Sequence, residues 1–310
     1  EDTMIAGDQL NNKEVVRMVI EEAPDRLKEL IGWGAEFDFD HTGDYDLGKE
    51  GGHSANRIIH HKDITGFEIE TTLLNQVKKL SNITTLPHHF AIDLITDHHI
   101  NQKIKSFKKE AINCYGAYVL NQNTQEIDTY VANKTIIATG GAGQVYASTT
   151  NPTIATGDGI AMAYRAKAQI EDIEFVQFHP TALYQPGVSP AFLISEAVRG
   201  FGAYLVNKKG ERFMLEIDDR AELASRDIVA RAIDHELNKT GEDAVYLDCR
   251  HLDFEKFLEH FPNIYEKCLS VGIDAKKDLI PVVPACHYFC GGIDVDKNGK
   301  SSIKNLYLEN

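Results

Sequence analysis

Apolar residues recur at helical spacing through the first part of the chain. Within residues 12–33 the apolar positions that follow this spacing are Val15, Val16, Val19, Ile20, Leu27, Leu30 and Ile31. Pro24 lies between the two apolar groups and lacks the amide hydrogen that a helix interior needs. The sequence therefore predicts two helices separated at Pro24. A Gly- and Asp-rich loop over residues 37–53 and a further helix over residues 66–80 are expected to follow.

Short apolar runs bounded by polar turns replace the helical pattern after residue 89. They predict four strands, at residues 90–96, 111–121, 127–131 and 135–139. The last of these runs enters Gly140-Gly141-Ala142-Gly143, and a helix over residues 159–167 is expected soon after it.

The pattern changes again at about residue 183, where helices expected at 226–238 and 254–270 alternate with strands at 203–207 and 245–248. Pro281 and Pro284 mark the end of this region, and residues 291–295 begin another strand. The sequence thus predicts an α/β (α+β) chain in two domains. Residues 1–182 and 281–310 form the first domain, and residues 183–280 form a second domain inserted into it.

Composition narrows the class of partner. The chain has 310 residues, of which 43% are hydrophobic and 25% are charged, as in an ordinary globular protein. Its formal net charge of −15 argues against binding nucleic acid, because a polyanion would be repelled. A small anionic substrate remains possible, since the local charge of a cleft decides its binding.

Several features bear on the compartment and on the extent of the chain. No apolar run approaches the roughly 20 residues that a membrane helix needs, and no signal peptide is visible after Glu1. Five irregularly spaced cysteines do not suggest a disulfide framework, so we expect a cytoplasmic protein. The chain lacks an initiator Met and stops at Leu306-Tyr307-Leu308-Glu309-Asn310 within an apparent strand, so we expect a fragment of a longer protein.

Two glycine-containing segments could approach a cofactor. Thr139, Gly140 and Gly141 end a strand, where small residues let backbone amides approach a phosphate or a ring, although a tight turn explains them equally well. Asp158 precedes a helix, and it either accepts from a ribityl or ribose hydroxyl or caps the helix. No G-x-G-x-x-G fingerprint opens the chain. Either a cofactor is absent, or the sequence that holds its pyrophosphate lies upstream.

Three distant segments carry donors next to glycines or turns, and together they predict a pocket for a small dicarboxylate. They are Gln177-Phe178-His179-Pro180-Thr181, Ser225-Arg226-Asp227 and His287-Tyr288-Phe289-Cys290-Gly291-Gly292. A lone histidine such as His179 is more often a packed or solvent-facing residue than a ligand, and Thr181 adds a hydroxyl beside it. His287 lies before a turn that could present it to a ligand. The spacing of Cys286, His287 and Cys290 lacks a second ligand pair, so no metal site is expected.

Charged residues near these segments have two interpretations each. Arg226 lies in the first turn of a predicted helix, where the dipole favours an anion, or it pairs with Asp227 or Glu222 on a solvated face. Glu196 and Arg199, spaced i, i+3, form a surface pair or a proton relay with Arg226. Glu50, in a Gly-rich loop, either pairs with an ammonium group or is solvated.

In combination these segments resemble the flavoprotein family of succinate dehydrogenases, fumarate reductases and L-aspartate oxidases, over essentially the whole chain. The most specific pieces lie at residues 49–60, 177–184, 223–234 and 281–292. The Glu-Gly-Gly-His-Ser loop at residues 50–54 is typical of the oxidases. So is Cys290 before the final Gly-Gly, where the dehydrogenases usually have Met. The chain is therefore most similar to the L-aspartate oxidase branch.

The resemblance implies a fold and a cofactor. It implies a partial Rossmann-like FAD-binding domain without its N-terminal βαβ unit, and an inserted capping domain at residues 183–280. FAD would be bound non-covalently, and positions that match FAD contacts are Phe90, Ala91, Thr139, Gly140, Gly141 and Asp158. The family's N-terminal pyrophosphate loop and C-terminal segments are missing. We therefore expect this chain alone to be inactive, and whether it retains FAD is left open.

The resemblance also implies an activity, the oxidation of L-aspartate to iminoaspartate in NAD biosynthesis with oxygen or fumarate as electron acceptor. Substrate-pocket positions are Glu50 for the amino group, and His179, Thr181 and His287 for the carboxylates. Proton transfer would fall to Arg226 with Glu196 and Arg199. Quinolinate synthase is the implied partner enzyme. The alternatives are a fumarate reductase or succinate dehydrogenase flavoprotein subunit, or a non-catalytic fragment that only binds dicarboxylates.

Overall fold

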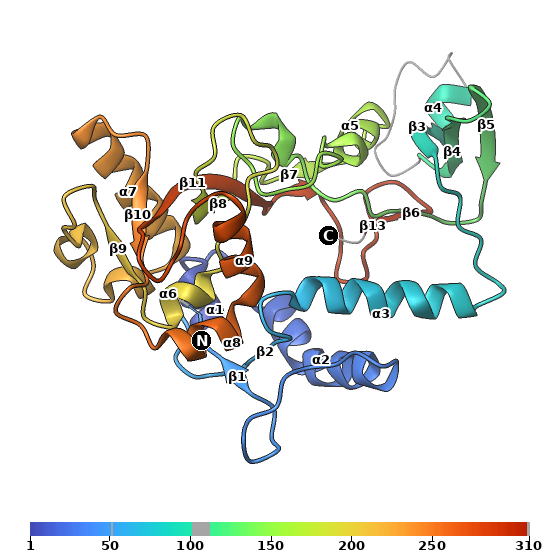
Figure 1. Cartoon of the computed structure of the whole chain (residues 1–310). Coiled ribbons are helices and arrows are strands. Elements are labelled where there is room, and N and C mark those ends of the chain that lie inside the picture. The colour runs from blue at the N-terminus through green and yellow to red at the C-terminus, as the bar shows by residue number, and fades with distance from the viewer. Residues whose placement is uncertain (51, 101–111, 309–310) are drawn as a thin grey trace. The chain divides into compact units, whose positions relative to one another are not determined.

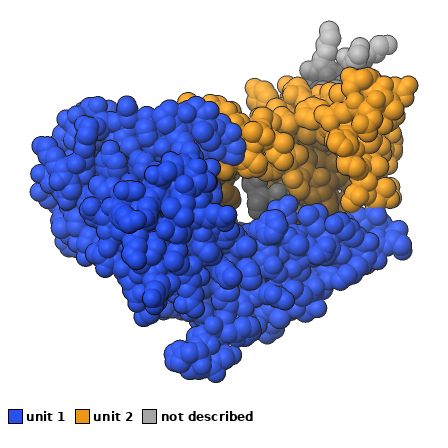
Figure 2. All heavy atoms as spheres, viewed as in Figure 1, with its two compact units in different colours: residues 1–83, 178–285 blue, residues 84–177, 286–310 orange. Residues whose placement is uncertain are grey.

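A computed structural model of the chain describes residues 1–50, 52–100 and 112–308. These residues divide into two compact units, and each is described by itself (Figures 1 and 2). Unit 1 contains residues 1–83 and 178–285, and unit 2 contains residues 84–177 and 286–310. The assignment of residues 1–182 and 281–310 to one domain, with residues 183–280 as a second domain inserted into it, stays a prediction.

The helices of unit 1 lie in both of its chain segments. They are α1 (Asp2–Ala6), α2 (Lys13–Gly32), α3 (Thr65–Lys79), α6 (Glu196–Gly200), α7 (Arg226–Thr240), α8 (Phe254–His260) and α9 (Pro262–Ser270), with 3-10 turns η3 (Phe213–Glu216) and η4 (Ala221–Leu223). The predicted break at Pro24 was wrong, because α2 continues through it. Proline removes one hydrogen bond from a helix interior, and this 20-residue helix has enough turns on both sides to continue.

The single helix predicted over residues 254–270 is two helices, α8 and α9. The backbone of Phe261 is not helical, and Pro262 occupies the first turn of α9, where its missing amide hydrogen costs nothing. The side chain of Phe261 has no hydrogen-bond acceptor, so Asp63 caps the start of α9 instead. Its carboxylate accepts from the Ile264 amide at 2.9 Å and from Asn263 Nδ2 at 2.7 Å. The segment before α3 is thereby fastened to the start of α9.

A four-stranded sheet has the order β8-β11-β10-β9, with β8 (Val176–Leu183), β9 (Tyr204–Val206), β10 (Val245–Asp248) and β11 (Ile280–Phe289). Strand β10 pairs antiparallel with both neighbours, with Leu247 opposite Leu205 on β9 and Ile280 on β11. The sequence predicted β9 and β10 but missed β8 and β11. Prolines interrupt the strand pattern of β11, and proline cannot donate to a ladder. Unit 1 also has a short hairpin of β1 (Leu47–Gly48) and β2 (Ile58–Ile59).

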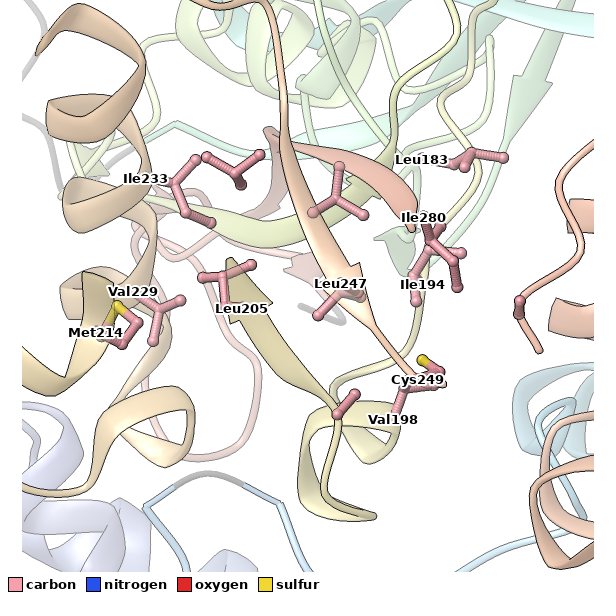
Figure 3. Close-up of a cluster of buried hydrophobic side chains, with 14 of the residues drawn as sticks. Leu183, Ile194, Val198, Leu205, Met214, Val229, Ile233, Leu247, Cys249 and Ile280 are labelled. Atoms are coloured by element: carbon pink, nitrogen blue, oxygen red, sulfur yellow. The ribbon is translucent and has the colours of Figure 1, made fainter. Parts of the chain in front are cut away.

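The hydrophobic core of unit 1 lies between this sheet and α7 (Figure 3). Side chains from the sheet, from α6 and α7, from η3 and from adjoining loops meet there, namely Leu183, Ile194, Val198, Leu205, Met214, Val229, Ile233, Leu247, Cys249 and Ile280. Fully burying one such leucine or isoleucine contributes about 1.5–3 kcal/mol. The core therefore gives α6 and α7, which carry the candidate site, a fixed support.

Unit 2 contains a three-stranded antiparallel sheet of β3 (His89–Thr96), β4 (Cys114–Asn121) and β5 (Glu126–Val131). All three strands were predicted, although position 111 of the second predicted strand lies outside the described residues. Gly116 permits the close pairing of β4 and β5. Its φ is +142°, and a Cβ there would lie 1.8 Å from the Tyr130 carbonyl oxygen. A short helix, α4 (Asp97–Ile100), follows β3.

The rest of unit 2 is built on two further strand pairs. Strand β6 (Thr135–Ile137) runs parallel to β13 (Leu306–Leu308), and β7 (Ile170–Glu171) pairs antiparallel with β12 (Gly292–Ile293). Helix α5 (Asp158–Arg165) packs its Met162 and Ala163 into a core with Ile137 and Leu306. A 3-10 turn, η2 (Gly143–Val145), follows β6. In the described ranges, no helix combines the length and the apolar character needed to cross a bilayer.

Candidate functional site

Two helices of unit 1 bring three candidate residues together. The Ser195 side chain caps α6 by accepting from the Ala197 amide, so that α6 begins at Glu196 and Arg199 follows one turn later. Arg226 is the first residue of α7. Its Nε lies 2.5 Å from Glu196 Oε2, and Arg199 Nη2 lies 3.4 Å from Glu196 Oε1. One carboxylate therefore bridges two guanidinium groups from different helices.

Burial distinguishes this array from a surface ion pair. The Arg199 and Glu196 side chains are 0% and 3% exposed, whereas Arg226 is 25% exposed. Burial lowers the pKa of Arg199, and the adjacent Arg226 charge lowers it further while Glu196 opposes both effects. Arg199 Nη1 also donates to the Glu222 carbonyl oxygen at 2.5 Å. The partly exposed Arg226 is thus the end of the array that a small ligand can reach.

Glu50 joins the array from the glycine-rich loop. Its Oε2 lies 3.3 Å from Arg226 Nη2. The β1–β2 hairpin closes the base of this loop, where the Arg57 amide donates to the Gly48 carbonyl oxygen. Helix α6 supports the adjoining residue, because a Cβ at Gly200 would lie only 2.8 Å from the Lys49 carbonyl oxygen. The backbone on both sides of Glu50 is therefore tied to neighbouring elements.

Asp2 fastens the far side of the same loop. Its carboxylate accepts from the Ser54 amide at 2.7 Å and the Ser54 hydroxyl at 2.9 Å, and it forms an ion pair with Arg57. The hydrogen bond from the Ser54 amide, together with the Arg57 contact, holds the pKa of Asp2 well below its usual range. Asp2 thus stays ionised and can keep its bonds to Ser54 and Arg57 over a wide pH range.

His179 and Thr181 lie on β8 and contact each other. The Thr181 amide donates to His179 Nδ1 at 3.2 Å, and the Thr181 hydroxyl donates to the Ile194 carbonyl oxygen at 2.9 Å. Because Nδ1 accepts, a neutral His179 ring carries its proton on Nε2. Both side chains are buried. The contacts with Thr181 fix the orientation of the imidazole ring on the strand.

Several expectations about single residues needed correction. Arg226 pairs neither with Asp227 nor with the Glu222 carboxylate, which bind Arg231 and Arg212 respectively. Glu196 and Arg199 do not form a surface pair, because the core covers both. Ser225 precedes α7 as expected, but its hydroxyl donates to Asp227 rather than capping a backbone amide. Only for Arg226 did tertiary contacts replace the expected local ones, since Ser225 bonds a residue two positions away and Glu196 and Arg199 remain a pair but a buried one.

His287 belongs to unit 2, where two residues that follow η2 hold it. Thr150 Oγ1 lies 2.8 Å from His287 Nδ1, and Asn151 Nδ2 donates to the His287 carbonyl oxygen at 2.7 Å. A parallel bridge between Thr149 and Cys286 sets the register of the two segments. Thr150 and Asn151 were missed by the sequence analysis, and no local signal marks them, because their partner lies 136–137 residues away.

The loop after β6 and the start of α5 form a second candidate site in unit 2. Gly140 has a φ of +68°, and Gly157, which precedes α5, has a φ of +77°. The Gly157 amide donates to the Gly141 carbonyl oxygen at 3.1 Å, which holds the loop beside the first turn of α5. Thr139 and Gly140 are exposed. The first amides of α5 have no acceptor within the helix, so exposed backbone donors and small residues gather at this place.

Asp158 caps nothing through its own side chain, and Thr156 Oγ1 donates to its carboxylate at 3.1 Å. The carboxylate is half-buried at the start of α5 and can accept from a hydroxyl. Phe90 and Ala91 lie on β3 opposite Leu120 and Val119, and the Phe90 side chain is exposed. The structure thus brings Thr139, Gly140, Gly141 and Asp158 to adjoining segments.

Replacing Gly159 by alanine should disrupt this second site. A Cβ there would lie 2.1 Å from Thr139 Oγ1 and 2.7 Å from Ile137 Cγ2, so loop 139–141 must shift. We expect a loss of about 1–3 kcal/mol in the free energy of unfolding, measured by denaturant unfolding. Gly66→Ala is the control, because nothing lies within 4 Å of a Cβ at Gly66 in α3. Equal stability of both variants would contradict the packing argument.

Comparison with known proteins gives the family. A family described as "FAD binding domain" matches residues 1–307. The chain is 50% identical to L-aspartate oxidase, chloroplastic, from Oryza sativa subsp. japonica, over 99% of this chain and 48% of that protein. It is 48% identical to L-aspartate oxidase 1 from Ralstonia nicotianae, over 99% of this chain and 56% of that protein. The chain therefore spans about half the length of the curated relatives that it matches.

Solved structures agree with this family. A quinol-fumarate reductase with menaquinol molecules matches with a TM-score of 0.87 and 33% identity, over 99% of this chain and 54% of that one. Mycobacterium smegmatis Sdh1 in complex with UQ1 matches with a TM-score of 0.76 and 32% identity, over 99% of this chain and 52% of that one. These matches confirm the predicted resemblance and the mixed α/β fold class.

Proposed function

The chain belongs to the family of FAD-binding domains, and from this premise we propose that the protein oxidises L-aspartate to iminoaspartate. FAD is its cofactor. The loop at Thr139–Gly141, in which Thr139 and Gly140 are exposed, and the start of α5 fit such a group, because the backbone amides of a helix N-terminus and the Asp158 carboxylate lie together there. We propose that these residues, with Phe90 and Ala91, hold FAD.

One observation carries the proposal, the contact of Arg226 with both Glu196 and Glu50. A dicarboxylate that also carries an ammonium group needs cationic donors and one carboxylate in the same place. Arg226 and Glu50 supply this combination. Each lies on an element that is held in place by contacts with neighbouring segments. The proposal follows from this chemistry and from the names of the relatives.

Each residue then has a role in binding or proton transfer. His179, Thr181 and His287 hold the substrate carboxylates, and Glu50 binds the ammonium group. When bound, FAD supplies the acceptor for the two electrons that the substrate loses as its Cα–H bond breaks. A guanidinium rarely gives up its proton. Arg226 therefore acts with Glu196 and Arg199, whose alternating charges favour proton movement along the array.

A direct assay tests this function. FAD-loaded, full-length protein should release hydrogen peroxide from oxygen, or reduce fumarate to succinate, with L-aspartate as electron donor. Succinate-dependent dye reduction without aspartate oxidation would instead support a fumarate reductase or succinate dehydrogenase subunit. The likeness to the quinol-fumarate reductase structure is the reason for retaining this second candidate function. Absence of flavin binding and of both activities would leave a fragment that only binds dicarboxylates.

Replacing Glu50 by glutamine should reduce aspartate oxidation more than fumarate reduction. Glutamine keeps the shape but loses the charge that an ammonium group needs, and succinate and fumarate carry no ammonium. We expect KM for aspartate to rise about tenfold or more, as for the loss of one charge-assisted hydrogen bond. Steady-state kinetics with both substrates give the comparison. Glu29→Gln, at an exposed ion pair with Arg26, is the control. Equal losses for both substrates would rule out ammonium pairing.

We further propose quinolinate synthase as the enzyme that takes up the iminoaspartate, since the product is unstable in water and relatives of this chain are aspartate oxidases. A reducing compartment, the cytoplasm, is proposed because all five cysteines, which the structure describes, are free thiols. The plant relatives are named chloroplastic. Fractionation of source cells followed by immunodetection would distinguish the two compartments.

A further inference from the structure

Glu222 lies beyond Arg199 in the array that leads to Arg226. Its carboxylate accepts from Arg212 through two bonds, Nε to Oε1 at 3.0 Å and Nη2 to Oε2 at 2.8 Å. Oε1 also accepts from the Leu205 amide of β9 at 3.1 Å. The Glu222 carbonyl oxygen accepts from Arg199 Nη1. This buried residue therefore connects the central sheet to Arg199.

Arg212 is held from both sides. Its guanidinium lies 3.7 Å from the centre of the Tyr204 ring, and the Tyr204 ring stacks on His251 at 3.9 Å. His251 Nε2 lies 3.0 Å from the Gly202 carbonyl oxygen. The two bonds to Glu222 raise the pKa of Arg212, so the fork stays charged. Lysine could not replace this planar fork, which matches a carboxylate in two places.

The backbone before Glu222 is strained. Ala221 has a φ of +48°, in the left-handed region that costs a non-glycine residue on the order of 1 kcal/mol. Burial of Ala221 and the bond from its amide to the Asp218 carbonyl oxygen, at 2.8 Å, hold this conformation. The turn directs the two ends of Glu222 apart, the carbonyl toward Arg199 and the carboxylate toward Arg212. Such strain persists where the surrounding contacts impose it.

From Glu222 the contacts continue through Arg199 and Glu196 to Arg226. Because Nη1 of Arg199 is bound to the Glu222 carbonyl oxygen, its Nη2 faces Glu196 Oε1 at 3.4 Å. The other oxygen of the same carboxylate, Glu196 Oε2, lies 2.5 Å from Arg226 Nε. From Glu50 to Arg212, six side chains alternate in charge, and four of the five steps between them are ion pairs.

We propose that Glu222 and Arg212 are positioning residues for Arg226, acting through Arg199 and Glu196 without touching substrate. The proposal rests on the role given to Arg226 in the proposed function. The Glu222–Arg212 ion pair, at the edge of the sheet, thus affects the rate of the reaction. The guanidinium of Arg226 is fixed by a chain of contacts that ends on β9, rather than by helix α7 alone.

A double-mutant cycle on FAD-loaded, full-length protein tests it. Arg212→Met should lower kcat for aspartate oxidation about tenfold or more with KM little changed, because a misplaced group costs rate rather than binding. In an Arg226→Lys background, whose geometry is already lost, the same change should lower kcat less than about twofold. Equal factors in the two backgrounds, or a loss confined to KM, would show that Arg212 acts independently and overturn the proposal.

Arg220→Met is the matched control. Arg220 also binds a carboxylate through Nε and Nη2, that of Asp218, and lies in the same loop, but it does not contact Glu222. Its loss should leave kcat unchanged within about twofold, as expected for an exposed ion pair. A loss of kcat as large as that of Arg212→Met would point to general loosening of the loop and contradict the proposal.

Two further measurements keep the outcome clear. If Arg212→Met does not fold, Arg212→Lys retains the charge and loses only the two-bond fork and the ring contact. A crystal structure of either variant should show the Arg226–Glu196 contact lengthened, which can be read whether or not aspartate proves to be the substrate. An unchanged contact would overturn the positioning proposal while leaving the proposed function intact. Fumarate reduction by the wild type without aspartate oxidation would instead contradict the proposed function and leave the positioning proposal intact.

Discussion

Replacing Arg226 by leucine should lower turnover of L-aspartate by about 10³-fold or more while FAD stays bound. Arg226 is the partly exposed member of the buried array and the one that contacts Glu50. Leucine fills a similar volume but offers neither a charge nor a hydrogen-bond donor to a dicarboxylate. FAD retention should be unaffected, because the residues proposed to hold it lie in other segments.

Stopped-flow flavin reduction by aspartate measures this loss directly, and flavin absorbance checks cofactor content. Arg231→Leu is the matched control. Arg231 lies on the same helix and pairs with Asp227, but its side chain is 71% exposed. We expect near-normal turnover in that variant. Near-normal turnover in Arg226→Leu as well would remove Arg226 from the chemistry.

Replacing Glu196 by leucine should cost both stability and activity. Its carboxylate bridges Arg226 and the fully buried Arg199, so its loss leaves a buried guanidinium charge without its carboxylate partner. Removing one partner of a buried pair costs about 3–5 kcal/mol. We expect a loss of that size in the free energy of unfolding, together with turnover close to that of Arg226→Leu.

Denaturant unfolding and steady-state kinetics of the same preparations give the two effects. Glu196→Gln separates them, because glutamine keeps one hydrogen-bond acceptor and should unfold less easily than the leucine variant. Glu236→Gln is the control for buried carboxylates. Glu236 is 4% exposed on α7, but its partners are Asn207 and Lys239. Wild-type stability in Glu196→Leu would show that Arg199 does not need this partner.

The elements that the sequence predicted well depend on local patterns. Strand β10 was predicted at its observed limits, and α3 and α5 within two residues, because each has a clear period and a turn at its ends. Strand β11 was missed, since Pro281 and Pro284 lie in it and are local signals against a strand. The break between α8 and α9 was also missed, although Pro262 marks it, because apolar spacing continues across it.

The candidate site was likewise predictable only in part. Its residue types were readable, because Arg226, Glu196 and Glu50 lie in distinct motifs. Their pairing was not, since Arg226 has acidic neighbours in sequence that bind other residues. Thr150 and Asn151, which hold His287, and Asp2, which fastens the glycine-rich loop, had no signal at all.

The family, the local elements and the inventory of charged and imidazole groups could be recognised in the sequence. These follow from short segments, whose side chains and periods are fixed by neighbours in the chain. Which charges meet, and which of them are buried, depends on contacts made in the folded protein. Arg199 and Glu196, an ordinary i, i+3 pair in sequence, became a buried bridge because the core of unit 1 closes over α6. Ion pairing depends on distance and dielectric, and both are set by contacts between residues far apart in sequence.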